Sequence, residues 1–173
     1  LVVLARLLAP SDFGLMGIAL LTLAGLRQFS RLGLDTALIQ REEDNVDEYL
    51  NTAWSMKAVR GVVITGAAFV LAPYAAQFFS EPRAPDIIRV IALSPLITGL
   101  QNPGVMYLRK NLEFHKQFVY TLSSTVINVT VAIGAAIVLQ NVWALVFGSL
   151  AGSVMTFLAS YVIHGYRPWP ELH

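Results

Sequence analysis

Four basic residues lie in or beside apolar stretches of the sequence, where a bare charge is costly. They are Arg27, Arg31, Lys57 and Arg60. A charged side chain inside a bilayer must face water or a partner. Arg makes bidentate hydrogen bonds to phosphate oxygens, and Lys binds them as a point charge. We therefore predict that these four residues line a cavity that attracts an anionic substrate.

Arg27 and Arg31 lie four residues apart, so they share one face of a helix, and Asp35 continues that face. Arg27 follows Gly14 by 13 residues, which is roughly 20 Å at about 1.5 Å per residue. This depth is beyond the middle of a bilayer core that is about 30 Å thick. A second interpretation stays open, in which Arg31 pairs with Asp35 one helical turn away.

Lys57 and Arg60 share a face near the start of the following helix. This helix begins on the side of the membrane where the preceding one ends, so all four cations are expected at similar depth. The alternative is that both side chains extend along the helix to the lipid headgroups. The two interpretations differ in whether the charges face a cavity or the membrane surface.

The composition indicates that lipid surrounds the helices that carry these residues. Of the 173 residues, 55% are hydrophobic and 13% are charged, and the mean hydropathy is +0.60. Soluble domains carry about 25% charged residues, so this chain has too little polar surface for water. The predicted fold class is all-α, a polytopic transmembrane helix bundle. The net charge of +1 and the lack of a basic stripe give no indication of a nucleic-acid partner.

Five stretches are long and apolar enough to span a bilayer as helices. They comprise residues 14–39, 53–79, 84–108, 118–139 and 142–163. Residues 1–8 are expected to be the end of a further helix that lacks its start, so the chain is expected to be a fragment. Pro95 and Pro103 predict a kinked or broken helix in the third stretch. Gln140 and Asn141 predict a tight turn between the last two.

The distribution of Lys and Arg among the connections predicts the orientation in the membrane. One set of alternate connections carries five basic residues: Arg41, Arg109, Lys110, Lys116 and Arg167. The other set carries Arg6 and Arg83. Because basic connections tend to face the cytoplasm, the first set and the N-terminus are predicted to be cytoplasmic.

Longer strings of residues are similar to a known family. They are LARLLAPSDFGLMGIAL, FSRLGLDTALIQREED, LNTAWSMKAVRGVV, the run from 71 to 118, and NVWALVFGSLAGSVM. In this order and spacing they resemble the polysaccharide transporter family, which includes the Wzx-type lipopolysaccharide and exopolysaccharide flippases. That family lies within the multidrug/oligosaccharidyl-lipid/polysaccharide superfamily, and the resemblance covers essentially the whole chain.

The resemblance implies a transporter of two six-helix lobes around a central cavity. This chain would be the N-terminal lobe without most of its first helix. The implied function is to flip undecaprenyl-diphosphate-linked oligosaccharide across the bacterial inner membrane by alternating access, for O-antigen, capsule or exopolysaccharide biosynthesis. Expected partners are this lipid-linked substrate, membrane lipids, the missing C-terminal lobe and glycan polymerase machinery. The family commonly has less basic residues at the positions of Arg27 and Lys57, a departure that allows a substrate-specific role there.

Three other functions remain open. A multidrug or organic-cation antiporter of the same superfamily would need buried carboxylates, whereas the intramembrane charges here are mainly basic. A membrane enzyme of glycan assembly would need a large loop or a catalytic cluster, and the loops are short. The third is a scaffold that transports nothing. No catalytic residue, cofactor or metal site is expected, since the chain has no cysteine and its three histidines lack metal-ligand spacing.

Other polar and small residues are interpreted as structural. Ser11 or Asp12 is expected to cap the second helix. Gly148 and Gly152 predict close packing between helices of the same bundle, and Asn128 predicts a hydrogen bond between helices.

Overall fold

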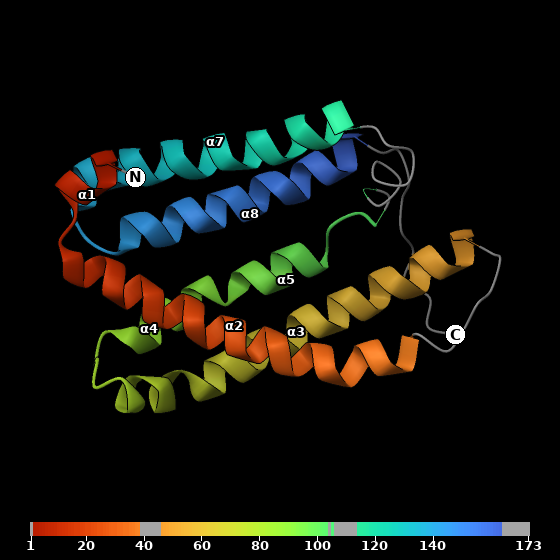
Figure 1. Ribbon diagram of the computed structural model, residues 1–173, viewed down its shortest axis with the longest axis horizontal. Helices are drawn as coiled ribbons and strands as arrows, with labels where there is room; N and C mark the ends of the chain where they lie inside the picture. The colour runs from red at the N-terminus through yellow and green to blue at the C-terminus, as the bar shows by residue number, and fades with distance from the viewer. Residues whose placement is uncertain (1, 39–45, 104, 106–113, 164–173) are drawn as a thin grey trace.

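The computed structural model describes the backbone of residues 2–38, 46–103, 105 and 114–163, and the side chains of residues 3–30, 54–103, 105 and 114–162. Within these residues there are seven helices and no strand. The helices are α1 (Val2–Leu7), α2 (Pro10–Leu38), α3 (Val46–Phe78), α4 (Ala84–Ile91), α5 (Leu93–Gly99), α7 (Phe114–Leu139) and α8 (Trp143–Ile163). The prediction of an all-α bundle is confirmed (Figure 1).

Four of the helices contain a segment long and apolar enough to cross a membrane. These segments are Pro10–Ser30, Trp54–Phe78, Phe114–Leu139 and Trp143–Val162. Large apolar side chains on them point outward; Phe78 is 82% exposed and Val162 is 85% exposed. In water such a surface favours aggregation, whereas lipid tails are as apolar as the side chains themselves. The chain is a multi-pass membrane protein.

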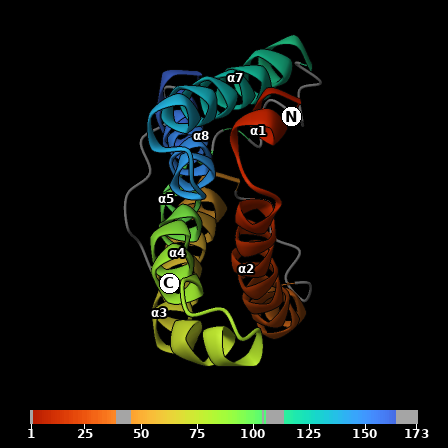
Figure 2. The same ribbon diagram turned by 90° about the vertical axis from the view of Figure 1, so that its left-hand side faces the viewer.

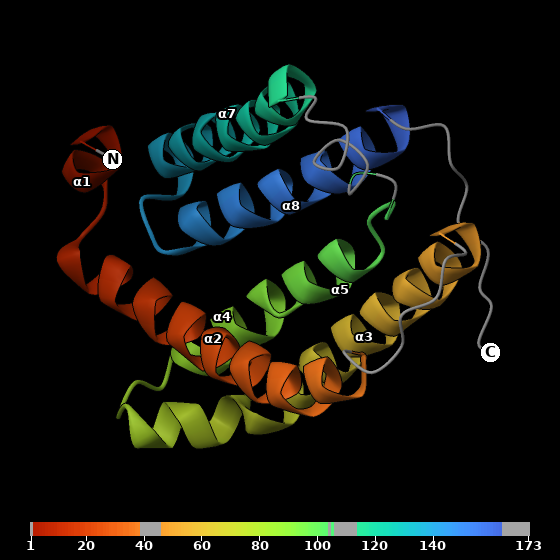
Figure 3. The ribbon, with the colours of Figure 1, turned by 45° about the vertical axis from the view of Figure 1, so that its right-hand side comes forward.

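The helices form two groups that meet along α8 (Figure 1). Helices α7 and α8 run antiparallel as a hairpin, and α5 packs beside α8. Helix α3 packs against α4 and α5, and α2 crosses α3 and α4 (Figures 2 and 3). Their common core contains Leu15 and Leu23 of α2, Ile64 of α3, Ile88 of α4 and Val146 of α8. Four helices thus share one hydrophobic core.

The ends of the helices sort into two opposite sides of the bundle (Figure 1). The end of α3, the starts of α2 and α4, and the turn from α7 to α8 lie on one side. The ends of α2 and α8 and the starts of α3 and α7 lie on the other. Successive connections between the spans therefore lie on alternate sides of the bundle. The prediction of orientation assumed this arrangement when it divided the basic connections into two sets. The cytoplasmic assignment of the second side stays a prediction.

The predicted span at residues 84–108 is broken into the two short helices α4 and α5. Pro95 has no N–H to donate to the carbonyl of Ile91, so the hydrogen-bond ladder is interrupted there. Ala92 lies between the two helices, and its carbonyl accepts a hydrogen bond from Thr65 Oγ1 of α3 at 2.7 Å. The prediction of a broken helix is confirmed, and α3 supplies a polar partner at the break.

The C-terminal end of α5 is held by two neighbouring helices. The carbonyl of Leu100 accepts hydrogen bonds from Trp54 Nε1 of α3 at 3.4 Å and from the Tyr161 hydroxyl of α8 at 3.0 Å. The N–H of Asn102 donates to the buried Ser160 Oγ of α8 at 3.0 Å. These bonds satisfy backbone groups that the end of a helix leaves unpaired. They fix α5 between α3 and α8.

Ser160→Ala is expected to lower the free energy of unfolding by about 1–3 kcal/mol, because the buried N–H of Asn102 loses its acceptor. The measurement is thermal unfolding of the purified protein in detergent. Ser123→Ala is the matched control, since the Ser123 hydroxyl donates within its own helix, to the Tyr120 carbonyl. Equal melting temperatures for the two variants would contradict the assigned role of Ser160.

The turn between α7 and α8 falls at its predicted position. Gln140 follows the end of α7 with a positive φ of 47°. Asn141 Oδ1 then accepts a hydrogen bond from the N–H of Trp143 at 3.1 Å, at the start of α8. A side-chain acceptor at this place satisfies one of the free N–H groups of the new helix.

Small residues let α7 and α8 pack closely, as predicted for Gly148 and Gly152. A Cβ on Gly148 would lie 2.6 Å from Ala132 Cβ, and one on Gly152 would lie 3.0 Å from Asn128 Cβ. Ser124 Oγ donates a hydrogen bond across the contact to the carbonyl of Gly152 at 3.0 Å. Polar bonds of this kind and backbone proximity are the usual means of helix association in lipid.

Helix α2 begins at Pro10, which suits the first helical position because proline has no N–H. Asp12 Oδ2 accepts a hydrogen bond from the N–H of Ala9, the residue before the helix, at 3.3 Å. This contact is the acidic half of a capping box. Asp12 therefore contributes to the cap from inside the helix, and its bond goes to the residue before the helix and not to a free N–H of the helix itself.

Candidate functional site

Three of the four predicted basic residues meet at one cavity of about 240 Å³ between α2, α3 and α5. The cavity is lined by Arg27, Lys57, Arg60, Gly61, Ile64, Pro95, Thr98 and Gly99; we call it the basic cavity. None of its described lining residues is acidic. A cavity with this lining attracts anions, because positive charges gathered in a concave site reinforce one another.

Two glycines bring the backbones of α3 and α5 together at the basic cavity. A Cβ on Gly61 would lie 2.7 Å from the carbonyl oxygen of Pro95, and one on Gly99 would lie 2.6 Å from the carbonyl oxygen of Lys57. No side chain fits at either position without moving a backbone. Lys57 is therefore held beside α5 by its own main chain, while its side chain remains exposed.

Arg60 links the two longer helices of the site. Its Nη2 donates a hydrogen bond to the carbonyl oxygen of Arg27 at 3.0 Å. This acceptor is a neutral backbone group, so the bond positions the guanidinium without cancelling its charge. Arg60 is half-buried and Arg27 is exposed, so Arg27 is the more accessible of the two to a ligand from outside the bundle.

The helix backbone places Arg31 and Asp35 on α2, and their side chains lie outside the described residues. The predicted pairing of Arg31 with Asp35, and the predicted place of Arg31 in the cavity, both stay predictions. Lys57 and Arg60 line the basic cavity. This is the location required by the interpretation in which their charges face a cavity, as opposed to the lipid headgroups.

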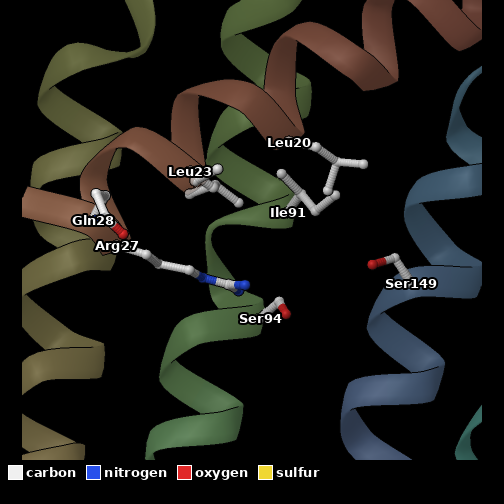
Figure 4. Close-up of a pocket in the computed structure, with 8 residues that line it drawn as sticks. Leu20, Leu23, Arg27, Gln28, Ile91, Ser94 and Ser149 are labelled. Atoms are coloured by element: carbon white, nitrogen blue, oxygen red, sulfur yellow. The ribbon is translucent and has the colours of Figure 1, made fainter. Parts of the chain in front are cut away.

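A second, larger cavity of about 340 Å³ adjoins the basic one, with Arg27 in the wall of both. It is lined by Leu20, Leu23, Ala24, Arg27, Gln28, Ile91, Ser94 and Ser149; we call it the hydroxyl cavity. Figure 4 shows the Arg27 side chain running from α2 toward Ser94 of α5, with Ser149 of α8 across the cavity from them. Sequence analysis missed both serines, because nothing in the sequence distinguishes them from the other serines of these apolar helices.

A short network of hydroxyl groups connects α5 to α8 at this cavity. The Oγ atoms of Ser94 and Ser153 are 3.0 Å apart, and Ser153 Oγ donates to the Ser149 carbonyl at 3.1 Å. Ser94 is 8% exposed, and the other polar lining residues are Arg27, Gln28 and Ser149. The arrangement offers a ligand one cation and several neutral hydrogen-bonding groups.

Residues that could hold a metal ion are not gathered anywhere in the described part of the chain. No group of three or more His, Asp or Glu there could hold a metal ion. The described ion pairs join Arg83 to Glu81 at 3.1 Å and Arg89 to Asp86 at 3.7 Å. Both lie around the start of α4, on the side of the bundle away from the start of α3.

One protein family matches nearly the whole chain. The family described as "Polysaccharide biosynthesis protein" matches residues 3–173. The chain belongs to this family. This confirms the family-level resemblance seen in the sequence.

Two relatives of the chain carry descriptive names. The succinoglycan biosynthesis transport protein ExoT of Rhizobium meliloti (strain 1021) is 24% identical over 167 residues, covering 96% of this chain and 33% of ExoT. The lipopolysaccharide biosynthesis protein WzxC of Escherichia coli (strain K12) is 24% identical over 164 residues, covering 95% of this chain and 32% of WzxC. The chain thus spans about a third of the length of these relatives. No solved structure matches the chain significantly.

Proposed function

We propose that this protein flips undecaprenyl-diphosphate-linked oligosaccharide across the bacterial inner membrane by alternating access. The product would serve O-antigen, capsule or exopolysaccharide biosynthesis. The observation that carries the proposal is the meeting of Arg27, Lys57 and Arg60, from two candidate membrane-spanning helices, at one cavity without a described acidic lining residue. The names of ExoT and WzxC, a transport protein and a lipopolysaccharide biosynthesis protein, support it.

The chemistry of the substrate explains why such a cavity is needed. A diphosphate is strongly hydrated, and moving it through hydrocarbon without compensation costs many kcal/mol. Guanidinium and ammonium groups replace its water with charge-assisted hydrogen bonds. The polyprenyl tail needs no such help, because the exposed apolar surfaces of the helices and the bilayer solvate it equally well.

Transport also requires parts that lie beyond the basic cavity. In two-lobe transporters the substrate binds near the middle of the membrane, and one lobe moves against the other around it. The chain spans about a third of ExoT and WzxC. We propose that a C-terminal lobe supplies the facing wall, with the N-terminus of the complete protein in the cytoplasm and glycan polymerase machinery as a further partner.

The leading alternative, an organic-cation antiporter, is less well supported. Export of a cation requires a carboxylate in the binding cavity, and the described lining residues of both cavities include none. No catalytic role is proposed, because the relatives' names describe transport and biosynthesis of polysaccharide without naming a reaction.

The complete protein, reconstituted in vesicles, tests the proposal. We expect it to move a fluorescent undecaprenyl-diphosphate oligosaccharide from one leaflet to the other faster than in protein-free vesicles. A nonspecific scramblase is excluded if a fluorescent phosphatidylcholine crosses no faster than in those vesicles. Transport of an organic cation such as ethidium, with no movement of the lipid-linked sugar, would overturn the proposal in favour of the antiporter.

A further inference from the structure

We propose that the hydroxyl cavity is a separate subsite that binds the uncharged sugar unit next to the diphosphate. This inference rests on the transport function proposed above and assigns different parts of the substrate to the two cavities. The basic cavity would take the diphosphate, and Arg27, which lines both cavities, would lie at the junction of phosphate and sugar.

The position of Arg27 makes the two cavities parts of one site. Arg27 lines both, so the two cavities adjoin and one ligand can extend from one into the other. A sugar attached directly to a diphosphate is a ligand of this kind. The volume of the hydroxyl cavity, about 340 Å³, lies in the range of about 300–1,000 Å³ found for small-molecule sites.

The linings of the two cavities differ in charge. The basic cavity adds Lys57 and Arg60 to Arg27, whereas the polar groups that the hydroxyl cavity adds are neutral: the amide of Gln28 and the hydroxyls of Ser94 and Ser149. The remaining lining is aliphatic. Hydroxyls and an amide over an aliphatic wall match a sugar ring, which presents hydroxyl groups at its rim and C–H groups on its faces.

The hydrogen-bond network leaves groups available for a ligand. A hydroxyl has one hydrogen and two acceptor lone pairs. The Ser94 and Ser153 hydroxyls share one hydrogen bond in which either oxygen can be the donor. In both cases the Ser94 oxygen keeps a lone pair that can accept from a ligand. The hydroxyl of Ser149 has no hydrogen-bond partner among the described residues and faces the cavity in Figure 4. One acceptor and one group that can donate or accept thus face the same space.

Binding of two probes by the complete protein tests the subsite. The probes are undecaprenyl diphosphate carrying its oligosaccharide and undecaprenyl diphosphate without sugar. Ser149→Ala is expected to weaken binding of the first about three- to tenfold, the value of a typical hydrogen bond, and to leave binding of the second unchanged. Ser149→Leu, which fills the cavity, is expected to weaken binding of the first more strongly and again to spare the second.

The controls separate this inference from the function on which it rests. Ser123→Ala removes a hydroxyl from α7 that donates within its own helix, and it should change neither affinity. The subsite would be overturned if the Ser149 variants lost affinity for both probes equally or for neither. Either result would leave the transport proposal intact. Failure of the unsubstituted protein to bind either probe would instead overturn the proposed function itself.

Discussion

Arg60→Gln in the complete protein is expected to reduce glycan export roughly 10- to 150-fold. Hydrogen bonds to charged groups contribute roughly 1.5–3 kcal/mol each, and every 1.4 kcal/mol corresponds to about a tenfold change. Arg60 lines the basic cavity and is positioned by its bond to the Arg27 carbonyl. The measurement is the rate of surface polysaccharide appearance in cells that carry the variant as their sole copy.

Two controls accompany Arg60→Gln. Arg83→Gln removes an equal charge from the opposite side of the bundle, where Arg83 pairs with Glu81, and export should stay normal. Arg60→Lys keeps the charge but loses the bidentate geometry. Its export rate should lie between those of Arg60→Gln and the unsubstituted protein. Normal export by Arg60→Gln at normal protein levels would show that the charge faces the headgroups and takes no part in binding.

Gly61→Ala is expected to destabilise the bundle by about 1–3 kcal/mol and to impair export as well. Its Cβ would lie 2.7 Å from the carbonyl oxygen of Pro95. The clash is with backbone, so α3 and α5 must move apart, and overpacking of this kind carries about that cost. The same movement displaces the basic cavity, which both helices line. Thermal unfolding in detergent measures the first effect.

Gly66 offers a matched control on the same helix. A Cβ there meets nothing within 4 Å, so Gly66→Ala should be neutral or stabilising by up to about 1 kcal/mol, the difference in helix propensity. Gly99→Ala should behave like Gly61→Ala, since its Cβ would lie 2.6 Å from the Lys57 carbonyl oxygen. Equal melting temperatures for the Gly61 and Gly66 variants would contradict the close approach of α3 and α5.

Local signals in the sequence predicted the fold where a physical rule acts over a few residues. The turn at Gln140 and Asn141 and the broken helix around Pro95 were both confirmed, because turn residues and a missing N–H act locally. The position of the break could not be predicted. The break at Ala92 is matched by a hydrogen bond from Thr65, and that partner lies on another helix.

The candidate site was predictable to the extent that it depends on charge. A cation in an apolar helix is unusual enough to be recognised from sequence, and Arg27, Lys57 and Arg60 indeed line one cavity. The hydroxyl cavity was not predictable. A serine in an apolar helix commonly bonds its own backbone, as Ser153 does, so the sequence gives no sign that Ser149 faces a cavity.

The bonds that hold both ends of α5 determine which wall of the site is movable. One end is tied through the Ala92 carbonyl to Thr65, and the other through the Leu100 carbonyl to Trp54 and Tyr161. Helices α3 and α5 therefore form a rigid pair, with a fixed separation between Lys57 and α5. Helix α2 contacts α3 of this pair through apolar side chains and through the hydrogen bond from Arg60 to the Arg27 carbonyl. Under the proposed transport function, we expect adaptation to glycans of different size to be least costly by tilting α2, which leaves the spacing of the α3 charges unchanged.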